Sequence, residues 1–461
     1  MNEEKKEAAV YSEHLFLWPF SISGKNGSRS ASENYLKALN GQKCKCWKPL
    51  KASETMPVSE LYEVREYLSN EARGIFPTLS PKPEDASGGC SILRRPVPPN
   101  SSFEIQFGET TWSLRPVELE LHLYPFGVGI LILHVVNERY GELSEIARFA
   151  DYGRRVRQPF VPGKGETGLA ADRLALHLGQ QTFEFDLLNQ ARQAVDNSVS
   201  ADKSVSADKS SKSFQTLFDV VDPDIQLTPV ADDRMFEMEL LYHQGLSEEL
   251  KDKAWREKEE LTKTLYALAF CDPDVTSPSC QDAEMRRRLL LQTIDPRWAD
   301  EGTLYAATEY SFLCITGEDW FPRNVLGSNF LHQYLYMTSL VLAQRTGLMN
   351  FAERAGKQTS GWAKQNWFSK LKSDRNLKHL NKEYAAFQAL LMISRYSDQD
   401  QGIELYEQLQ KQLRVEQYRD KIQRQLSDAF ASATLDAQNR QSWIIGLVGI
   451  GLAILQIILS A

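Results

Sequence analysis

The chain has 461 residues, of which 42% are hydrophobic and 25% charged, and its net charge is −8. This length predicts about two or three domains, and this composition predicts folded cores rather than disorder. The acidic balance argues against nucleic-acid binding, which needs a basic face, and six cysteines in so long a chain exclude a disulfide scaffold.

The N-terminal segment, residues 1–100, is expected to contain a strand, a helix and a proline-rich linker. It begins without the apolar stretch of a secretory signal. A short apolar run predicts the strand over 12–22, and apolar residues on one face predict the helix over 59–72. Prolines and a glycine pair favour a linker over 77–100.

Residues 101–320 are expected to form an α/β domain. Apolar and polar residues alternate where strands with one buried face are predicted, and an unbroken apolar run predicts a central strand. A six-residue polar sequence that repeats at once predicts a disordered insert over 197–213. The expected strands are 103–107, 117–123, 128–136, 236–242 and 304–316, and the expected helices are 141–153 and 250–270.

Residues 321–440 are expected to form a helical stalk. Apolar residues recur every three or four positions, which predicts helices over 330–351, 381–396 and 403–433. Neither proline nor glycine occurs between Glu404 and Trp443, so the last helix is expected to continue towards the C-terminus without a break.

Residues 441–461 are expected to form a single transmembrane helix. The run 443–459 carries no charge and is long enough to cross a bilayer, although a buried core helix is the alternative. Basic residues precede the run and none follows, which predicts a cytoplasmic N-terminus and a single-pass inner-membrane protein. Small residues and a glutamine on one face predict helix association and a homo-oligomer, with a monomeric anchor as the alternative. These residues are Gly446, Gly449, Ala453 and Gln456.

The predicted fold class is therefore α+β. It consists of an N-terminal mixed α/β cytoplasmic domain, long C-terminal helices that form a stalk, and one C-terminal transmembrane helix.

No sequence motif indicates an enzyme. Residues 163–168 have the glycine spacing of a dinucleotide loop, but no strand precedes them, so a plain loop is favoured. The seven histidines are scattered singly, and a metal site from them would need tertiary contacts. No catalytic or cofactor-binding residue is predicted.

A possible ligand site is formed by Arg154 and Arg155, just past the helix expected over 141–153. Arginine pairs can hold a phosphate-bearing signal. Ion pairs within the fold are the alternative.

The order of parts resembles the CorA-type divalent-cation transporter superfamily. The stretches that look alike are Phe126–Leu131, Asp151–Arg155, Tyr334–Arg345 and Gln401–Tyr406. The resemblance implies a funnel-like cytoplasmic domain, a stalk helix, oligomerisation, and a divalent cation such as magnesium. Transporters of the family have two membrane helices, with Gly-Met-Asn at the end of the first. In this chain the similar residues Gly347–Asn350 lie far before the predicted membrane helix, so the ion-selectivity role of the family motif is not assigned to them.

The leading functional hypothesis is a tail-anchored, oligomeric CorA-like membrane protein with membrane lipid as a partner. It would act as a cation channel, transporter or defence effector controlled by its cytoplasmic domain. A membrane-anchored scaffold without conductance is the alternative, and an anchored enzyme with a tertiary-assembled site is a third class.

Overall fold

The fold is described from a computed structural model of the whole chain. It describes residues 10–22, 35, 46–50, 58–79, 89–161, 168–200, 221, 227–230, 234–359 and 367–431.

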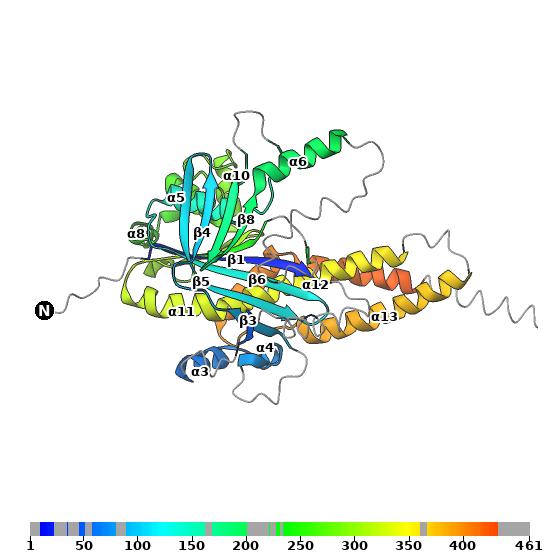
Figure 1. Cartoon of the computed structure of the whole chain (residues 1–461). Helices are drawn as coiled ribbons and strands as arrows, with labels where there is room; N and C mark the ends of the chain where they lie inside the picture. Colours follow the sequence, from blue (N-terminus) through cyan, green and yellow to red (C-terminus); the bar gives the residue numbers. More distant parts are fainter. Residues whose placement is uncertain are drawn as a thin grey trace, which may run out of the picture.

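The centre of the described fold is one mixed sheet of 13 strands (Figure 1). Its main path runs β11-β12-β13-β10-β1-β6-β5-β4-β7-β8, with β2, β3 and β9 at its side. The pair β10 and β13 is parallel, and the other pairs are antiparallel. The strands are β1 (Ser12–Ser21), β2 (Lys48–Pro49), β3 (Ser91–Arg95), β4 (Ser102–Phe107), β5 (Thr110–Tyr124), β6 (Val128–Asn137), β7 (Arg173–Leu178), β8 (Gln181–Asp186), β9 (Thr228–Pro229), β10 (Phe236–Tyr242), β11 (Ile294–Asp295), β12 (Leu304–Ala307) and β13 (Ser311–Thr316).

Helices cover both faces of the sheet. One core joins the sheet to α3 (Val58–Tyr67), α4 (Asn70–Ile75), α12 (Leu335–Thr359), α13 (Trp367–Leu391) and α14 (Asp400–Gln412). The other joins it to α5 (Leu143–Arg154), α8 (Gln244–Leu250), α9 (Glu259–Ala269) and α10 (Ala283–Leu291). The remaining elements are α6 (Leu187–Ser200), α11 (Gly327–Asn329), the short 3₁₀ turns Pro77–Leu79, Trp255–Glu257 and Ala299–Glu301, and π-helical turns over Pro322–Leu326 and Phe330–Tyr334.

Strand β1 is apolar at nearly every position because both of its faces are buried. Leu15 and Leu17 pack into the core with α12, whereas Phe16 and Trp18 pack into the core with α5. Successive side chains of a strand point to opposite faces, so a strand covered on both sides needs apolar residues throughout.

Most predicted strands are present, but several helices begin or end at other residues than the sequence pattern indicates. Ser69 separates α3 from α4, because its hydroxyl caps the second helix by accepting from the backbone N–H of Ala72. The helix expected over 250–270 begins only at Glu259. The hairpin of β7 and β8 and the helix α10 were not predicted.

The expected continuous helix from residue 403 is interrupted. Helix α14 ends at Gln412, Arg414 has a positive φ of 57°, and a second helix runs over 415–431. A left-handed residue ends a helix without proline or glycine, so the absence of those residues did not predict continuity.

The structure corrects the expected membrane architecture. In the part of the chain that it describes, no helix is both long and apolar enough to cross a membrane. The two longest helices, α12 and α13, contain charged residues such as Arg345 and Lys378, and charge is costly in lipid. A transmembrane helix, a tail anchor and a single-pass inner-membrane location are therefore not part of the described fold, and the predicted fold class was wrong on this point.

Some sequence predictions lie outside the described residues. These are most of the glycine loop at 163–168, residues 201–213 of the predicted insert, and the run 443–459 with Gly446, Gly449, Ala453 and Gln456.

Gly347, within the stretch compared above with a selectivity motif, is a packing residue between two helices. A Cβ atom at this position of α12 would lie 2.4 Å from the ring of Phe387 in α13. A methyl group fits there only if the ring of Phe387 shifts or the two helices separate.

We therefore expect Gly347→Ala to lower the free energy of unfolding by about 1–3 kcal/mol through overpacking. Gly356→Ala on the same helix is the matched control, because nothing lies within 4 Å of a Cβ there. It should raise stability by about 0.5–1 kcal/mol through helix propensity. Urea unfolding of both variants measures the difference, and equal effects would contradict this packing role.

Candidate functional site

A pocket of about 300 Å³ lies where the two helical layers and the sheet meet. Its wall is formed by the end of α5, the beginning of β10, the turn between β12 and β13, α12 and the helix over 415–431. Part of the lining is apolar, including Phe236, Leu342 and Met349. Among the residues that the structure describes, the polar part of the lining contains Arg154, Arg234 and Arg345 and one carboxylate, that of Glu309.

The ring of Tyr310 contacts the guanidinium groups of two of these arginines. The guanidinium of Arg154 lies 5.4 Å from the centre of the Tyr310 ring, and that of Arg234 lies 4.9 Å from it. These are cation–π distances. The backbone fixes the same region, because the N–H of Met235 donates to the carbonyl of Arg154 at 2.7 Å and thereby ties α5 to β10.

The pocket carboxylate is already paired. Arg345 donates to Glu309 at 2.8 Å, and Arg414 lies 3.6 Å from the other oxygen of Glu309. The Nε atom of Arg345 is nevertheless buried without a hydrogen-bond partner.

Arg154 is 2% exposed and contacts Asp151 at 3.2 Å through Nη2. Its Nε and Nη1 atoms are buried without hydrogen-bond partners. Burial raises the pKa of Asp151, although Arg154 and Arg155 both oppose that shift. A buried guanidinium with unused donors is costly, and an anion that reached these donors would accept charge-assisted hydrogen bonds from them.

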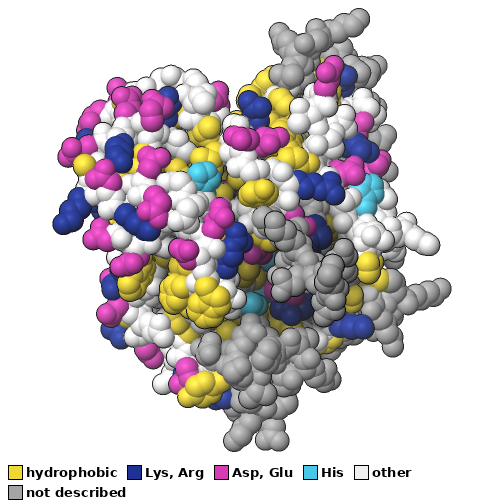
Figure 2. All heavy atoms as spheres, turned by 90° about the vertical axis from the view of Figure 1, so that its left-hand side faces the viewer, with side chains coloured by type: hydrophobic (Ala, Val, Ile, Leu, Met, Phe, Trp, Pro, Cys, Tyr) yellow, Lys and Arg dark blue, Asp and Glu magenta, His cyan; other side chains and the backbone are white. Residues whose placement is uncertain are grey.

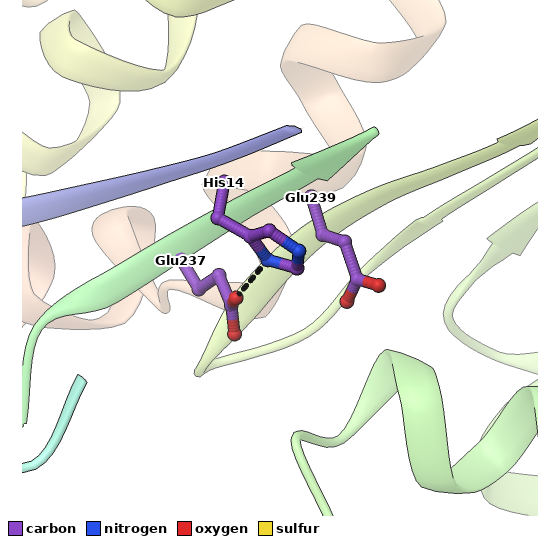
Figure 3. Close-up of side chains that lie close together, drawn as sticks. All are labelled: His14, Glu237 and Glu239. Carbon is purple, nitrogen blue, oxygen red and sulfur yellow. Dashed lines mark hydrogen bonds and ion pairs between the residues drawn. The ribbon is translucent and has the colours of Figure 1, made fainter. Parts of the chain in front are cut away.

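A second buried polar group lies close by, on the face of the sheet that α5 covers. His14 of β1 stands opposite Glu239 of β10 in the strand register, and Glu237 is two residues away on the same face (Figure 3). These three residues are termed the His14 cluster. Candidate ligand atoms from all three lie within 4.8 Å of one another, and all three side chains are buried.

Hydrogen bonds orient His14. Its Nδ1 lies 2.8 Å from Glu237, and its Nε2 lies 2.9 Å from the hydroxyl of Ser12. Asn137 donates to that hydroxyl at 3.0 Å, so Ser12 can donate in turn to Nε2 while the Nδ1 proton goes to Glu237. The thiol of Cys271 donates to the other oxygen of Glu237 at 3.4 Å.

Glu239 is the unsatisfied member of the cluster. Its Oε1 atom is buried without a hydrogen-bond partner. Burial, and next the charge of Glu237, raise the pKa of Glu239 well above its ordinary value. Burial also raises the pKa of the Cys271 thiol. A histidine, two carboxylates and a thiol are the groups that bind transition metals in proteins.

The other face of the sheet carries a comparable network that is complete. His122 of β5 contacts Glu120 at 2.9 Å and Ser339 of α12 at 2.7 Å, and Tyr124 contacts the same serine at 2.8 Å. Arg94 lies 2.6 Å from Glu120. Because each of these histidine and carboxylate groups has partners, this network serves to join β5 to α12.

Of the two arginines singled out in the sequence, the structure brings one to the pocket. Arg154 lines it, whereas Arg155 donates from Nε to both oxygens of Asp151 at 2.9 Å and is not among the lining residues. The candidate anion-binding residues are therefore Arg154, Arg234 and Arg345, in place of the predicted pair Arg154 and Arg155.

Sequence reasoning missed the other members of both groups. Arg234, Tyr310 and Arg345 come from separate segments, and no spacing links them. Glu237 and Glu239 alternate with Phe236 and Met238, which indicated a solvent-facing side of the strand. One signal was available: a histidine inside the apolar run of β1 must face a covered surface and needs polar partners there.

Comparisons with protein-family models, with curated proteins and with solved structures give no match. The resemblance to CorA-type proteins therefore stays a prediction.

The pH dependence of stability is expected to depend on Glu118. Burial and then the charge of Glu120 raise the pKa of Glu118 from 4.5 to about 7, against the opposing charge of Arg94. Glu120 itself behaves oppositely: burial opposes its ionisation, but the hydrogen bond and charge of His122 and the charge of Arg94 lower its pKa to about 2.

The folded chain thus holds the Glu118 proton more tightly than the unfolded chain, and stability falls as the pH rises from 4.5 to about 7. Glu118→Gln should remove this loss and raise the free energy of unfolding by about 1–2 kcal/mol above pH 7, after allowance for partial exposure. The gain should vanish below pH 4.5. Glu184→Gln, at a carboxylate that is 53% exposed, is the control in the same urea titrations. A gain that is the same at all pH values would refute the assignment.

Proposed function

We propose that this protein is a ligand-binding protein that takes a small phosphate-bearing molecule into the arginine-lined pocket. The observation that carries the proposal is the buried, unpartnered Nε and Nη1 of Arg154 beside Arg234 and Arg345 in a pocket with one paired carboxylate. Such donors favour an anion.

The pocket lining supports a particular kind of anion. Guanidinium groups match phosphate oxygens with parallel N–H donors, and their planar geometry favours phosphate over a spherical ion. The apolar side chains of Phe236, Leu342 and Met349 and the ring of Tyr418 can contact an apolar or aromatic part of the same molecule. A volume of about 300 Å³ suits a small molecule.

The charge distribution also supports the proposal. The chain is acidic, with a net charge of −8. On the face shown in Figure 2, acidic and basic side chains are interspersed. In the described part of the pocket lining, three arginines stand against the one carboxylate of Glu309, so this lining is more basic than the chain as a whole. Binding of a ligand requires neither ion transport nor a membrane, and the proposal makes no use of them.

We expect AMP to raise the Tm of the wild-type chain and adenosine to leave it unchanged, because only AMP supplies the anion. Inorganic phosphate should compete with AMP. Arg234→Gln should weaken AMP binding by about 10–100-fold, which is the usual cost of losing a hydrogen bond to a charged group. Calorimetric titration measures the affinities, and Arg154→Gln is the second variant.

Arg148→Gln is the matched control, because Arg148 is an exposed arginine of the same helix α5 and does not line the pocket. It should bind AMP as the wild type does. The proposal fails if neither phosphate nor AMP binds the wild type, or if Arg148→Gln weakens binding as much as Arg234→Gln.

A further inference from the structure

We infer that the His14 cluster is a divalent transition-metal site, with zinc as the ion that its donors fit best. This inference is independent of the phosphate pocket. Its ligands are His14, Glu237 and Glu239, with the thiol of Cys271 adjacent to Glu237.

The positions of the donor atoms support a metal site. Strand pairing places His14 directly opposite Glu239, and the donor atoms of the cluster lie within 4.8 Å of one another. Donors placed tetrahedrally around one ion at about 2.0–2.2 Å lie about 3.3–3.6 Å apart, so the three side chains must move inward by roughly 1 Å when the ion binds. Figure 3 shows the imidazole between the two carboxylates, which extend from the same strand and on the same side of the sheet.

The unused carboxylate oxygen of Glu239 also supports a metal site. Glu239 is 2% exposed and its Oε1 has no hydrogen-bond partner. Buried polar atoms in native proteins are nearly always satisfied, so an orphaned carboxylate oxygen beside a histidine needs an explanation. The complete network around His122 shows that this fold can satisfy a buried histidine and carboxylate when no ion is needed.

Neighbouring residues hold the donor side chains in place. The hydroxyl of Ser12 holds the far side of the His14 ring, and Asn137 holds that hydroxyl. With an ion at Nδ1 the ring proton would lie on Nε2 and donate to Ser12, as to a second-layer partner at a metal site. The edge of Phe149 packs on the same ring, with centroids 5.0 Å apart. Cys271 has a positive φ of 49°, an unusual conformation for a residue with a side chain, and its thiol reaches Glu237 at 3.4 Å.

The chemistry of these donors favours zinc over magnesium. Magnesium prefers six oxygen ligands and retains water, whereas this cluster is buried and offers nitrogen, oxygen and sulfur. Asp151 and Arg154 are the next charged groups. They influence the thiol of Cys271 electrostatically, together with Glu237 and Glu239.

Zinc content tests the inference directly. The whole chain, unfolded and refolded with zinc and then passed over a chelating resin, should retain about one zinc ion per chain by mass spectrometry of the metal. Glu239→Gln keeps the shape of the side chain and removes the buried charge, so it should fold but bind zinc about 10–100-fold more weakly. Its near-ultraviolet circular dichroism and Tm verify folding.

Glu118→Gln is the matched control and should retain zinc as the wild type does. In the cobalt-substituted chain, a visible d–d spectrum should disappear in Glu239→Gln, and a thiolate-to-cobalt charge-transfer band lost only in Cys271→Ser would identify the thiol as a ligand. The inference is overturned if the wild type retains no zinc, or if Glu239→Gln and the wild type bind zinc equally.

Discussion

Both faces of the central sheet are covered by helices, and this double burial constrains every polar side chain on its inner strands. A hydroxyl, imidazole or carboxylate there loses its contact with water and must be satisfied inside the protein. The strands β1, β5 and β10 nevertheless carry histidines and glutamates at buried positions. The position of each partner is therefore as important to the fold as the apolar packing around it.

The two buried histidines meet this constraint differently. His122 lies between a glutamate of its own strand and Ser339 of α12, and the guanidinium of Arg94 neutralises the glutamate. His14 is well oriented, but the carboxylate opposite it keeps an unpartnered oxygen. The same residue types thus form a structural connection on one face and an incomplete coordination shell on the other. Completeness of hydrogen bonding, and not residue type, separates the two roles.

How much of this could be predicted from the sequence depends on the range over which each feature is encoded. Apolar runs such as 128–136 gave their strands correctly, because the pattern is local. Alternation over 236–242 gave the strand but not its environment, since Glu237 and Glu239 are buried under α5 and α9 rather than exposed. The break at Arg414 carried no glycine or proline signal. Ser69, in contrast, is an ordinary capping residue whose signal was present in the sequence and was overlooked.

The candidate sites were less predictable than the strands, because their members meet only in the folded chain. Arg154 was selected for its neighbour Arg155, yet its pocket partners Arg234 and Arg345 lie far away in the sequence. The membrane architecture failed for a related reason. The stalk was inferred from apolar residues at helical spacing, a local pattern that does not show which element they pack against, and the helices assigned to it share a core with the sheet.

Arg154 connects the two sites. It lines the pocket, contacts Asp151, and contributes with Glu237 and Glu239 to the electrostatic field at Cys271. The unpartnered atoms differ between the two sites: they are the Nε and Nη1 donors of Arg154 at the pocket and the Oε1 acceptor of Glu239 in the His14 cluster. A buried donor lacks an acceptor, whereas a buried carboxylate oxygen lacks a donor or a cation, so the two candidate sites require ligands of opposite charge.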